Sequence, residues 1–190
     1  MIQNRETFNG MIDIRYGWDA YRRQYSGGLI GGLANRNVAI DCDARAIFCG
    51  KNGKPLSNDL NECSVYYANK TLFAAAAIHN GDNQTGGQGD SECIAVDLDS
   101  LPPEVNLIIL TMDLFKEKKS IGVGKIQEAY VRLIDKETEE ELTRVDIHHL
   151  SSDKKLVVGG RIQREENGWR FISDGTAYNE KSIEDYLTHI

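Results

Sequence analysis

An alternation of apolar and polar residues constrains the fold of this chain more than any other feature. Every second residue from Val38 to Phe48 is apolar, and Asp41, Asp43 and Arg45 occupy positions between them. Successive side chains of a β-strand point to opposite faces, so the pattern predicts a strand with one buried face and one polar face. On such a strand Asp41 and Asp43 point the same way, about 6.6 Å apart along the chain.

Further segments with strand character are separated by Gly, Asn and Pro turn signals; they cover residues 12–16, 62–67, 72–79, 93–98, 106–114, 129–135, 142–147, 155–163 and 169–173. Many short strands between turns are typical of an antiparallel sandwich or barrel. Near the C-terminus, Ile183, Tyr186 and Leu187 follow helical spacing, with Ser182 as a candidate N-cap. We therefore expect one all-β domain over residues 1–190, with a short C-terminal helix.

An acidic, glycine-rich segment lies between two of the predicted strands. Residues 79–92 read His-Asn-Gly-Asp-Asn-Gln-Thr-Gly-Gly-Gln-Gly-Asp-Ser-Glu and combine carboxylates, side-chain amides, hydroxyls and glycines. Calcium is bound by oxygen ligands of these kinds, arranged around a tightly curled chain. Glycine permits the curl because it adopts positive φ without a steric penalty. A polar hairpin loop without a ligand is the alternative interpretation of this segment taken alone.

The charges of the two acidic elements favour a metal site. If the elements meet in space, five carboxylates share one region: Asp41, Asp43, Asp82, Asp90 and Glu92. Two like charges about 4 Å apart repel by about 4 kcal/mol at an effective dielectric constant of about 20. No lysine or arginine lies within the loop, although Arg45 lies beside the upstream pair. Divalent cations would relieve this repulsion.

The composition excludes some functions. The 190 residues include 29 acids and 22 bases, a net charge of −7, which disfavours nucleic acid or an anionic membrane as a direct partner. The N-terminus lacks the apolar region of a signal peptide, and no apolar run approaches the length of a membrane span, so we expect a cytoplasmic protein.

Several other residues are expected to be structural. The cysteines, which lie at positions 42, 49, 63 and 93, form no Cys-x-x-Cys pair and are expected to be reduced and mostly buried. Trp18 and Trp169 are expected in the core. His79 adjoins the acidic loop, but histidine suits softer metals than calcium.

Four landmarks follow one another along the chain: Gly17-Trp18-Asp19, the strand Ile40–Ala44, the loop Gly81–Glu92, and the later strands containing Gly124–Arg132 and Gly168–Phe171. Together and in this order they resemble the TerD family of bacterial tellurite-resistance and general stress proteins. The resemblance covers roughly residues 12–178. Ser91 departs from the family pattern, which has a second aspartate there, and Ala39 stands where an acid is common. Met112-Asp113-Leu114 also departs from the pattern, so no role is assigned to that segment.

This resemblance implies a β-sandwich whose acidic loops bind Ca²⁺ at one edge. Carried over residue by residue, it gives a set of expected metal ligands: Asp19, Asp41, Asp43, Asp82, Asn83, Thr85, Asp90 and Glu92. The implied function is a non-enzymatic calcium-binding module in resistance to tellurite and other chemical stress, acting with other stress-resistance proteins. Two alternatives are a metal-dependent hydrolase and a calcium-dependent phospholipid-docking module, in which calcium would bridge the protein to a membrane. No Gly-x-Ser-x-Gly or His-Glu-x-x-His motif is present to favour the hydrolase.

Overall fold

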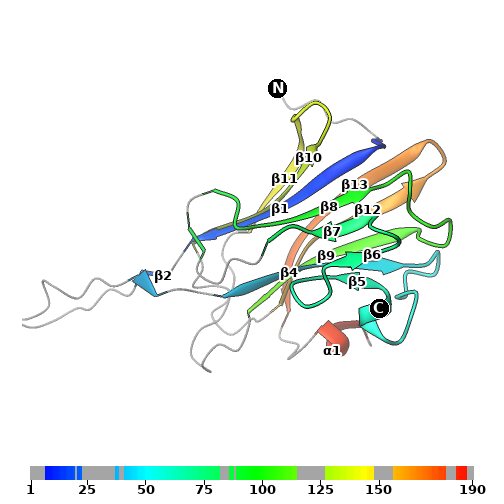
Figure 1. Ribbon diagram of the computed structural model, residues 1–190. Coiled ribbons are helices and arrows are strands. Elements are labelled where there is room, and N and C mark those ends of the chain that lie inside the picture. Colours follow the sequence, from blue (N-terminus) through cyan, green and yellow to red (C-terminus); the bar gives the residue numbers. More distant parts are fainter. Residues whose placement is uncertain are drawn as a thin grey trace, which may run out of the picture.

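Two antiparallel β-sheets pack face to face in the computed structural model of the protein (Figure 1). The structure describes residues 7–19, 21–22, 37–38, 41–81, 86–87, 89–114, 127–147, 156–178 and 183–187. The expected all-β sandwich is therefore confirmed. Among the described residues, no helix has the length and apolar character needed to cross a membrane.

One sheet has six strands, in the spatial order β11 (Glu141–Ile147), β10 (Gln127–Asp135), β1 (Met11–Asp19), β8 (Glu92–Asp97), β7 (Ala77–His79) and β6 (Thr71–Leu72). The other has five, in the order β13 (Gly168–Tyr178), β12 (Leu156–Glu165), β9 (Leu107–Leu114), β4 (Cys42–Cys49) and β5 (Ser64–Val65). A separate pair is formed by β2 (Tyr21–Arg22) and β3 (Asn37–Val38). A short 3-10 turn, η2 (Leu60–Glu62), precedes β5.

The main core lies between the two sheets. The alternating apolar residues Cys42, Ala44, Ala46 and Phe48 of β4 are fully buried there, as the sequence pattern predicts. Alternate residues of β1 face them from the six-stranded sheet, ending with Trp18. Trp18 and Trp169 both belong to this core, which confirms their expected place.

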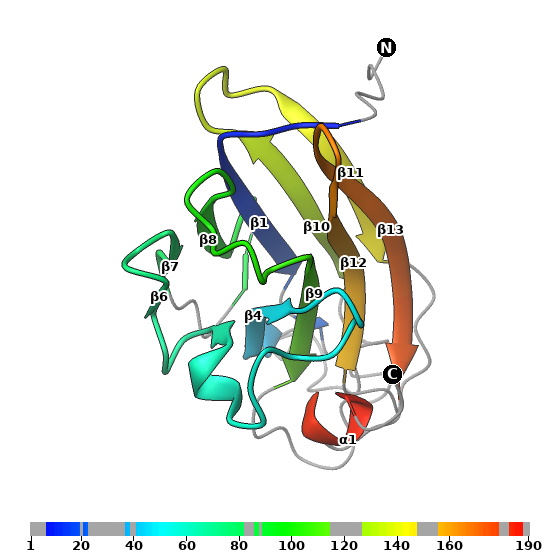
Figure 2. The same ribbon diagram turned by 90° about the vertical axis from the view of Figure 1, so that its right-hand side faces the viewer.

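A second apolar cluster covers the outer face of the five-stranded sheet. Ile47 and Cys49 of β4 pack there with Ile183 and Tyr186 of the five-residue helix α1 (Ile183–Leu187). Figure 2 shows α1 beyond the ends of β12 and β13. The candidate N-cap Ser182 lies outside the described residues. The expectation that this strand is half-buried is wrong, because every residue of β4 except Arg45 is buried and the cluster with α1 covers Ile47 and Cys49 on this face.

The expected continuous strand over residues 72–79 is wrong. The chain reverses between β6 and β7, so that Thr71 pairs with Ile78, and Phe73, Ala74 and Ala75 have φ angles of 52°, 52° and 72°. Non-glycine residues rarely adopt positive φ, so their sequence does not signal this turn. The ring of Phe73 packs edge-on against Phe48, with the ring centroids 5.1 Å apart, and this contact anchors the turn.

Candidate acidic site at the start of β4

The two acidic elements of the sequence meet in space. The Oε2 atom of Glu92, at the start of β8, accepts a hydrogen bond from the backbone N–H of Ala44 in β4 at 2.8 Å. The loop before β8 runs beside the end of β1, where the N–H groups of Gly87 and Ser91 donate to the carbonyls of Trp18 and Tyr16. The end of β1 therefore lies close to the starts of β4 and β8.

Gly86 lets the acidic loop approach β1 closely. Its φ is +67°, and a Cβ atom built there would lie 2.6 Å from Cδ1 of Trp18. The contact with Trp18 would exclude a side chain at this position even if the positive φ angle were tolerated. The glycine-rich sequence of the loop is thus explained here by packing on Trp18 as well as by chain reversal.

Glu92 links the two sheets through buried contacts. Its side chain is fully buried and points into the sandwich, where Oε2 also lies 3.3 Å from Nε2 of His79. Buried carboxylates are stable only where donors surround them. Glu92 of β8 therefore has a structural role, because it connects β8 to β4 and β7. His79 of β7 is its structural partner.

A cluster of carboxylates lies at the start of β4. Asp43 lies directly opposite Asp113 in the β4–β9 register, and Asp41 immediately precedes β4. Burial raises the pKa of the Cys42 thiol well above its usual value, and the charges of Asp113, Asp41, Asp43 and Glu92 raise it further. Burial and the charge of Asp43 also raise the pKa of Tyr67. The cluster thus includes Asp113, to which the sequence analysis assigned no role.

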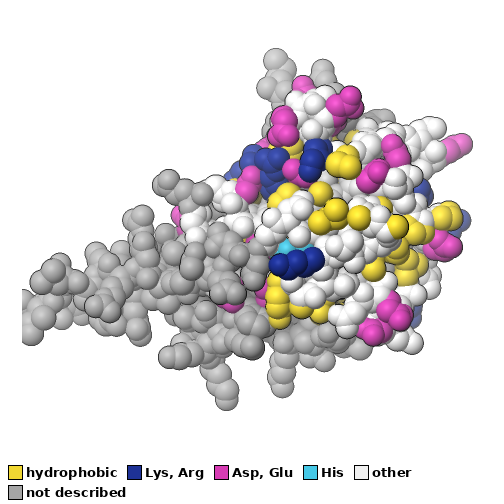
Figure 3. Space-filling view, viewed as in Figure 1, with side chains coloured by type: hydrophobic (Ala, Val, Ile, Leu, Met, Phe, Trp, Pro, Cys, Tyr) yellow, Lys and Arg dark blue, Asp and Glu magenta, His cyan; other side chains and the backbone are white. Residues whose placement is uncertain are grey.

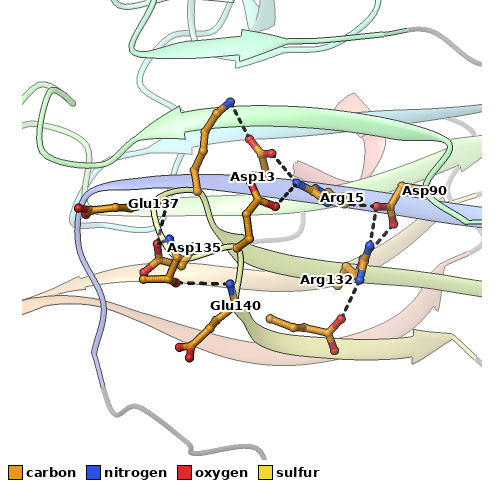
Figure 4. Close-up of polar contacts among 11 residues, drawn as sticks. Asp13, Arg15, Asp90, Arg132, Asp135, Glu137 and Glu140 are labelled. Atoms are coloured by element: carbon orange, nitrogen blue, oxygen red, sulfur yellow. Dashed lines mark hydrogen bonds and ion pairs between the residues drawn. The ribbon is translucent and has the colours of Figure 1, made fainter.

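Asp90 is held on the outer face of the six-stranded sheet. Its carboxylate accepts hydrogen bonds from Nη2 and Nε of Arg132 at 2.6 and 2.9 Å, and Nη1 of Arg15 lies 3.6 Å away (Figure 4). It also accepts a hydrogen bond from the Tyr130 hydroxyl at 2.8 Å. Burial alone would raise the pKa of Asp90, but the bonds from Arg132 and Tyr130 outweigh it and leave this pKa below its usual value. The bases absent from the loop sequence are supplied by β1 and β10.

The ion pairs around Asp90 continue across this face. Arg15 also contacts Asp13 at 2.9 Å, Lys136 lies 3.3 Å from Asp13, and Arg132 lies 3.0 Å from Glu141. Figure 3 shows basic and acidic side chains intermixed on the part of the surface over β1. The acids on this face are therefore largely neutralised by neighbouring strands.

The remaining expected ligands fall into two groups. Asp19 is the last residue of β1 and is partly buried. Asp82, Asn83 and Thr85 lie outside the described residues. Among the residues that are described, no group of three or more His, Cys, Asp or Glu side chains is arranged to hold a metal ion.

Two residues of these acidic regions, Asp113 and Arg132, were not predicted from the sequence. Asp113 is the only charged residue in the otherwise mostly apolar strand β9, and a lone carboxylate in such a strand is a usable signal. Arg132 is separated from Asp90 by 42 positions, and only the pairing of β1 with both β8 and β10 brings the two together.

The chain is thus an antiparallel β-sandwich in which the acidic start of β4 lies close to the start of β8, where the acidic, glycine-rich loop ends. The TerD domain matches residues 3–189, and the chain belongs to this family.

Relatives carry names from tellurium resistance and stress response. Tellurium resistance protein TerZ of Serratia marcescens is 29% identical over 175 residues, covering 92% of this chain and 83% of that protein. Stress response protein SCP2 of Bacillus subtilis is 28% identical over 182 residues, covering 92% and 86%. The crystal structure of a TerD homologue from Streptomyces coelicolor A3(2) aligns with a TM-score of 0.68 at 15% identity, covering 91% of this chain and 92% of that one. The last likeness shows the fold alone.

Proposed function

We propose that this protein is a non-enzymatic calcium-binding module of the stress response, which acts through other stress-resistance proteins. The observation that carries the proposal is that Asp43 lies directly opposite Asp113 on neighbouring strands, with Asp41 immediately before β4. The names of the relatives, from tellurium resistance and stress response, support the physiological part.

The donor set fits a hard cation. Side chains directly opposite on antiparallel strands have Cβ atoms about 4.5–5.5 Å apart, and like charges there are destabilising. Asp43 and Asp113 occupy such positions, and a calcium ion bound by their oxygens would relieve the repulsion. Asp43 and Asp113 would contribute two carboxylates, and Asp82, Asn83 and Thr85 of the acidic loop would have to supply the further oxygens that the ion needs. When bound, the ion would neutralise this acidic end.

Glu92 and Asp90 have positioning roles in this proposal. Glu92 holds the start of β4 against β8 through the Ala44 N–H, so it fixes the backbone on which Asp43 lies. Asp90 anchors the acidic loop to Arg132 of β10. In this proposal Glu92 and Asp90 hold β4 and the acidic loop in position, and they do not themselves bind the ion.

A hydrolase is less well supported. His79 is the only histidine among the described residues, and its side chain is fully buried against Glu92. A general base must reach the proton it abstracts, directly or through one water. A structural role for His79 agrees with a module that works by binding.

Titration calorimetry of chelator-treated protein tests the proposal. We expect calcium to bind with a dissociation constant of roughly 10⁻⁷–10⁻⁵ M, and magnesium to bind more weakly because it requires a near-octahedral shell. Asp43→Asn should abolish binding or weaken it at least about tenfold, by loss of a charged ligand. Asp99→Asn is the matched control, since Asp99 is exposed in the connection after β8. Absence of calcium binding, or equal affinity for magnesium, would contradict the proposal.

A further inference from the structure

Arg45 of β4 is a partly buried arginine whose Nε lacks a hydrogen-bond acceptor. Its guanidinium lies over the ring of Tyr66, 4.0 Å from the centroid, and its Nε is buried. Among the described residues, no acceptor is bonded to that Nε. Buried N–H groups are almost always bonded, so the exception requires an explanation.

Two other stacked arginines show what is unusual. Arg144 lies 3.8 Å from the centroid of the Tyr130 ring, and its Nε donates to Asp146 at 2.6 Å. Arg164 lies 4.3 Å from the centroid of the Trp169 ring, and its Nε donates to a backbone carbonyl at 2.8 Å. In both, the ring fixes the guanidinium and the chain itself provides the acceptor. Arg45 is stacked on a ring in the same way, but no acceptor from the described part of the chain is bonded to its Nε.

Arg45 lines a cavity of about 500 Å³, a size typical of small-molecule sites. The cavity also contains an opposite charge, Asp59, which caps η2 by accepting hydrogen bonds from the backbone and side-chain N–H groups of Asn61 at 2.9 and 3.0 Å. No ion pair joins these two described charges, although they line one cavity. The remaining lining residues are Asn58, Leu60, Asn61 and Tyr66.

We propose that this cavity binds a small zwitterion of the α-amino-acid class. The ligand carboxylate would accept the N–H groups of Arg45, whose planar guanidinium suits bidentate carboxylate recognition. The ligand ammonium would lie against Asp59, and the amides of Asn58 and Asn61 would provide polar contacts. A multiply charged anion fits less well, because Asp59 would repel it. The inference goes beyond calcium binding and does not depend on it.

Nuclear magnetic resonance of the ¹⁵N-labelled full chain tests the proposal. Glycine, L-leucine and L-glutamine are titrated separately, followed by the amide and the N-acetyl derivative of the tightest ligand. We expect saturable shifts of the Arg45 Nε–H and the Tyr66 amide. The amide derivative lacks the carboxylate and the acetyl derivative lacks the ammonium, so each should bind at least about tenfold more weakly. Absence of shifts at millimolar amino acid would overturn the proposal.

Three variants separate the two ends of the ligand. Arg45→Gln should abolish binding, whereas Arg144→Gln, the matched control at another stacked arginine, should leave it unchanged. Asp59→Asn retains a residue that caps helical turns well, so it keeps the fold even if the Arg45 variant does not. It should weaken binding of the amino acid at least about tenfold but leave binding of its N-acetyl derivative unchanged. Equal binding of both ligands by wild-type protein would overturn the zwitterion assignment.

Discussion

On the outer face of the six-stranded sheet, Asp90 lies against Arg132 and Arg15, whereas at the end of the five-stranded sheet Asp43 lies opposite another acid, Asp113. Both aspartates come from elements that are acidic in the sequence. The neighbouring strands decide what each carboxylate does. Asp90 ties the acidic loop to the six-stranded sheet, whereas Asp43 adds to the cluster of carboxylates at the start of β4. A count of acids along the chain cannot separate these roles.

Among the variants considered, substitution of Glu92 should lower the stability of the protein most. Glu92→Ala would leave the Ala44 N–H buried without its acceptor and remove the partner of His79. We expect the free energy of unfolding to fall by about 3 kcal/mol, as for other broken buried polar pairs. Urea denaturation measures it. Glu92→Gln, which keeps an acceptor oxygen, should lose less, and equal losses for the two variants would contradict a role for that bond.

Calcium affinity should separate the two acidic regions. We expect Asp113→Asn to weaken calcium binding at least about tenfold, about 1.4 kcal/mol, because it removes a charge from the carboxylate cluster. Asp90→Asn should change the affinity by less than about threefold, since the loop loses an anchor but the cluster keeps its charges. Calorimetric titration of both variants checks this. The reverse order would place the ion on the other side of the sandwich.

The ion pairs of Asp90 should give a smaller effect that depends on pH and salt. The pKa of Asp90 is lowered in the folded protein, so its stabilisation is present above the unfolded pKa of about 3.9 and is lost as the pH falls through the folded pKa. Its side chain is 23% exposed, so solvent screening limits the contribution to about 1 kcal/mol near neutral pH.

Asp90→Asn measures that contribution directly. Melting curves of this variant and of wild-type protein should differ most near neutral pH at low salt and should converge in strong acid or high salt. A difference that persists at low pH would mean that the hydrogen bonds to Asp90, rather than its charge, stabilise the loop.

Local patterns in the sequence predicted much of this structure. The alternation along β4 and the turn signals gave the all-β sandwich, because burial on one face of a strand imposes a period of two. The turn at Phe73–Ala75 could not be predicted, since nothing in Phe-Ala-Ala indicates positive φ. The pairing of Asp90 with Arg132 and the facing of Asp43 by Asp113 depend on strand order and register, which join distant residues.

The most direct test of the calcium site is a calcium titration of the ¹⁵N-labelled protein followed by nuclear magnetic resonance. We expect the backbone amides of Asp43, Ala44 and Asp113 to shift saturably, while the Nε–H resonance of Arg132 stays in place because its pairing with Asp90 is retained. Magnesium at equal concentration should cause smaller shifts. Movement of the Arg132 resonance without any change at Asp43 and Asp113 would contradict a calcium site at the start of β4.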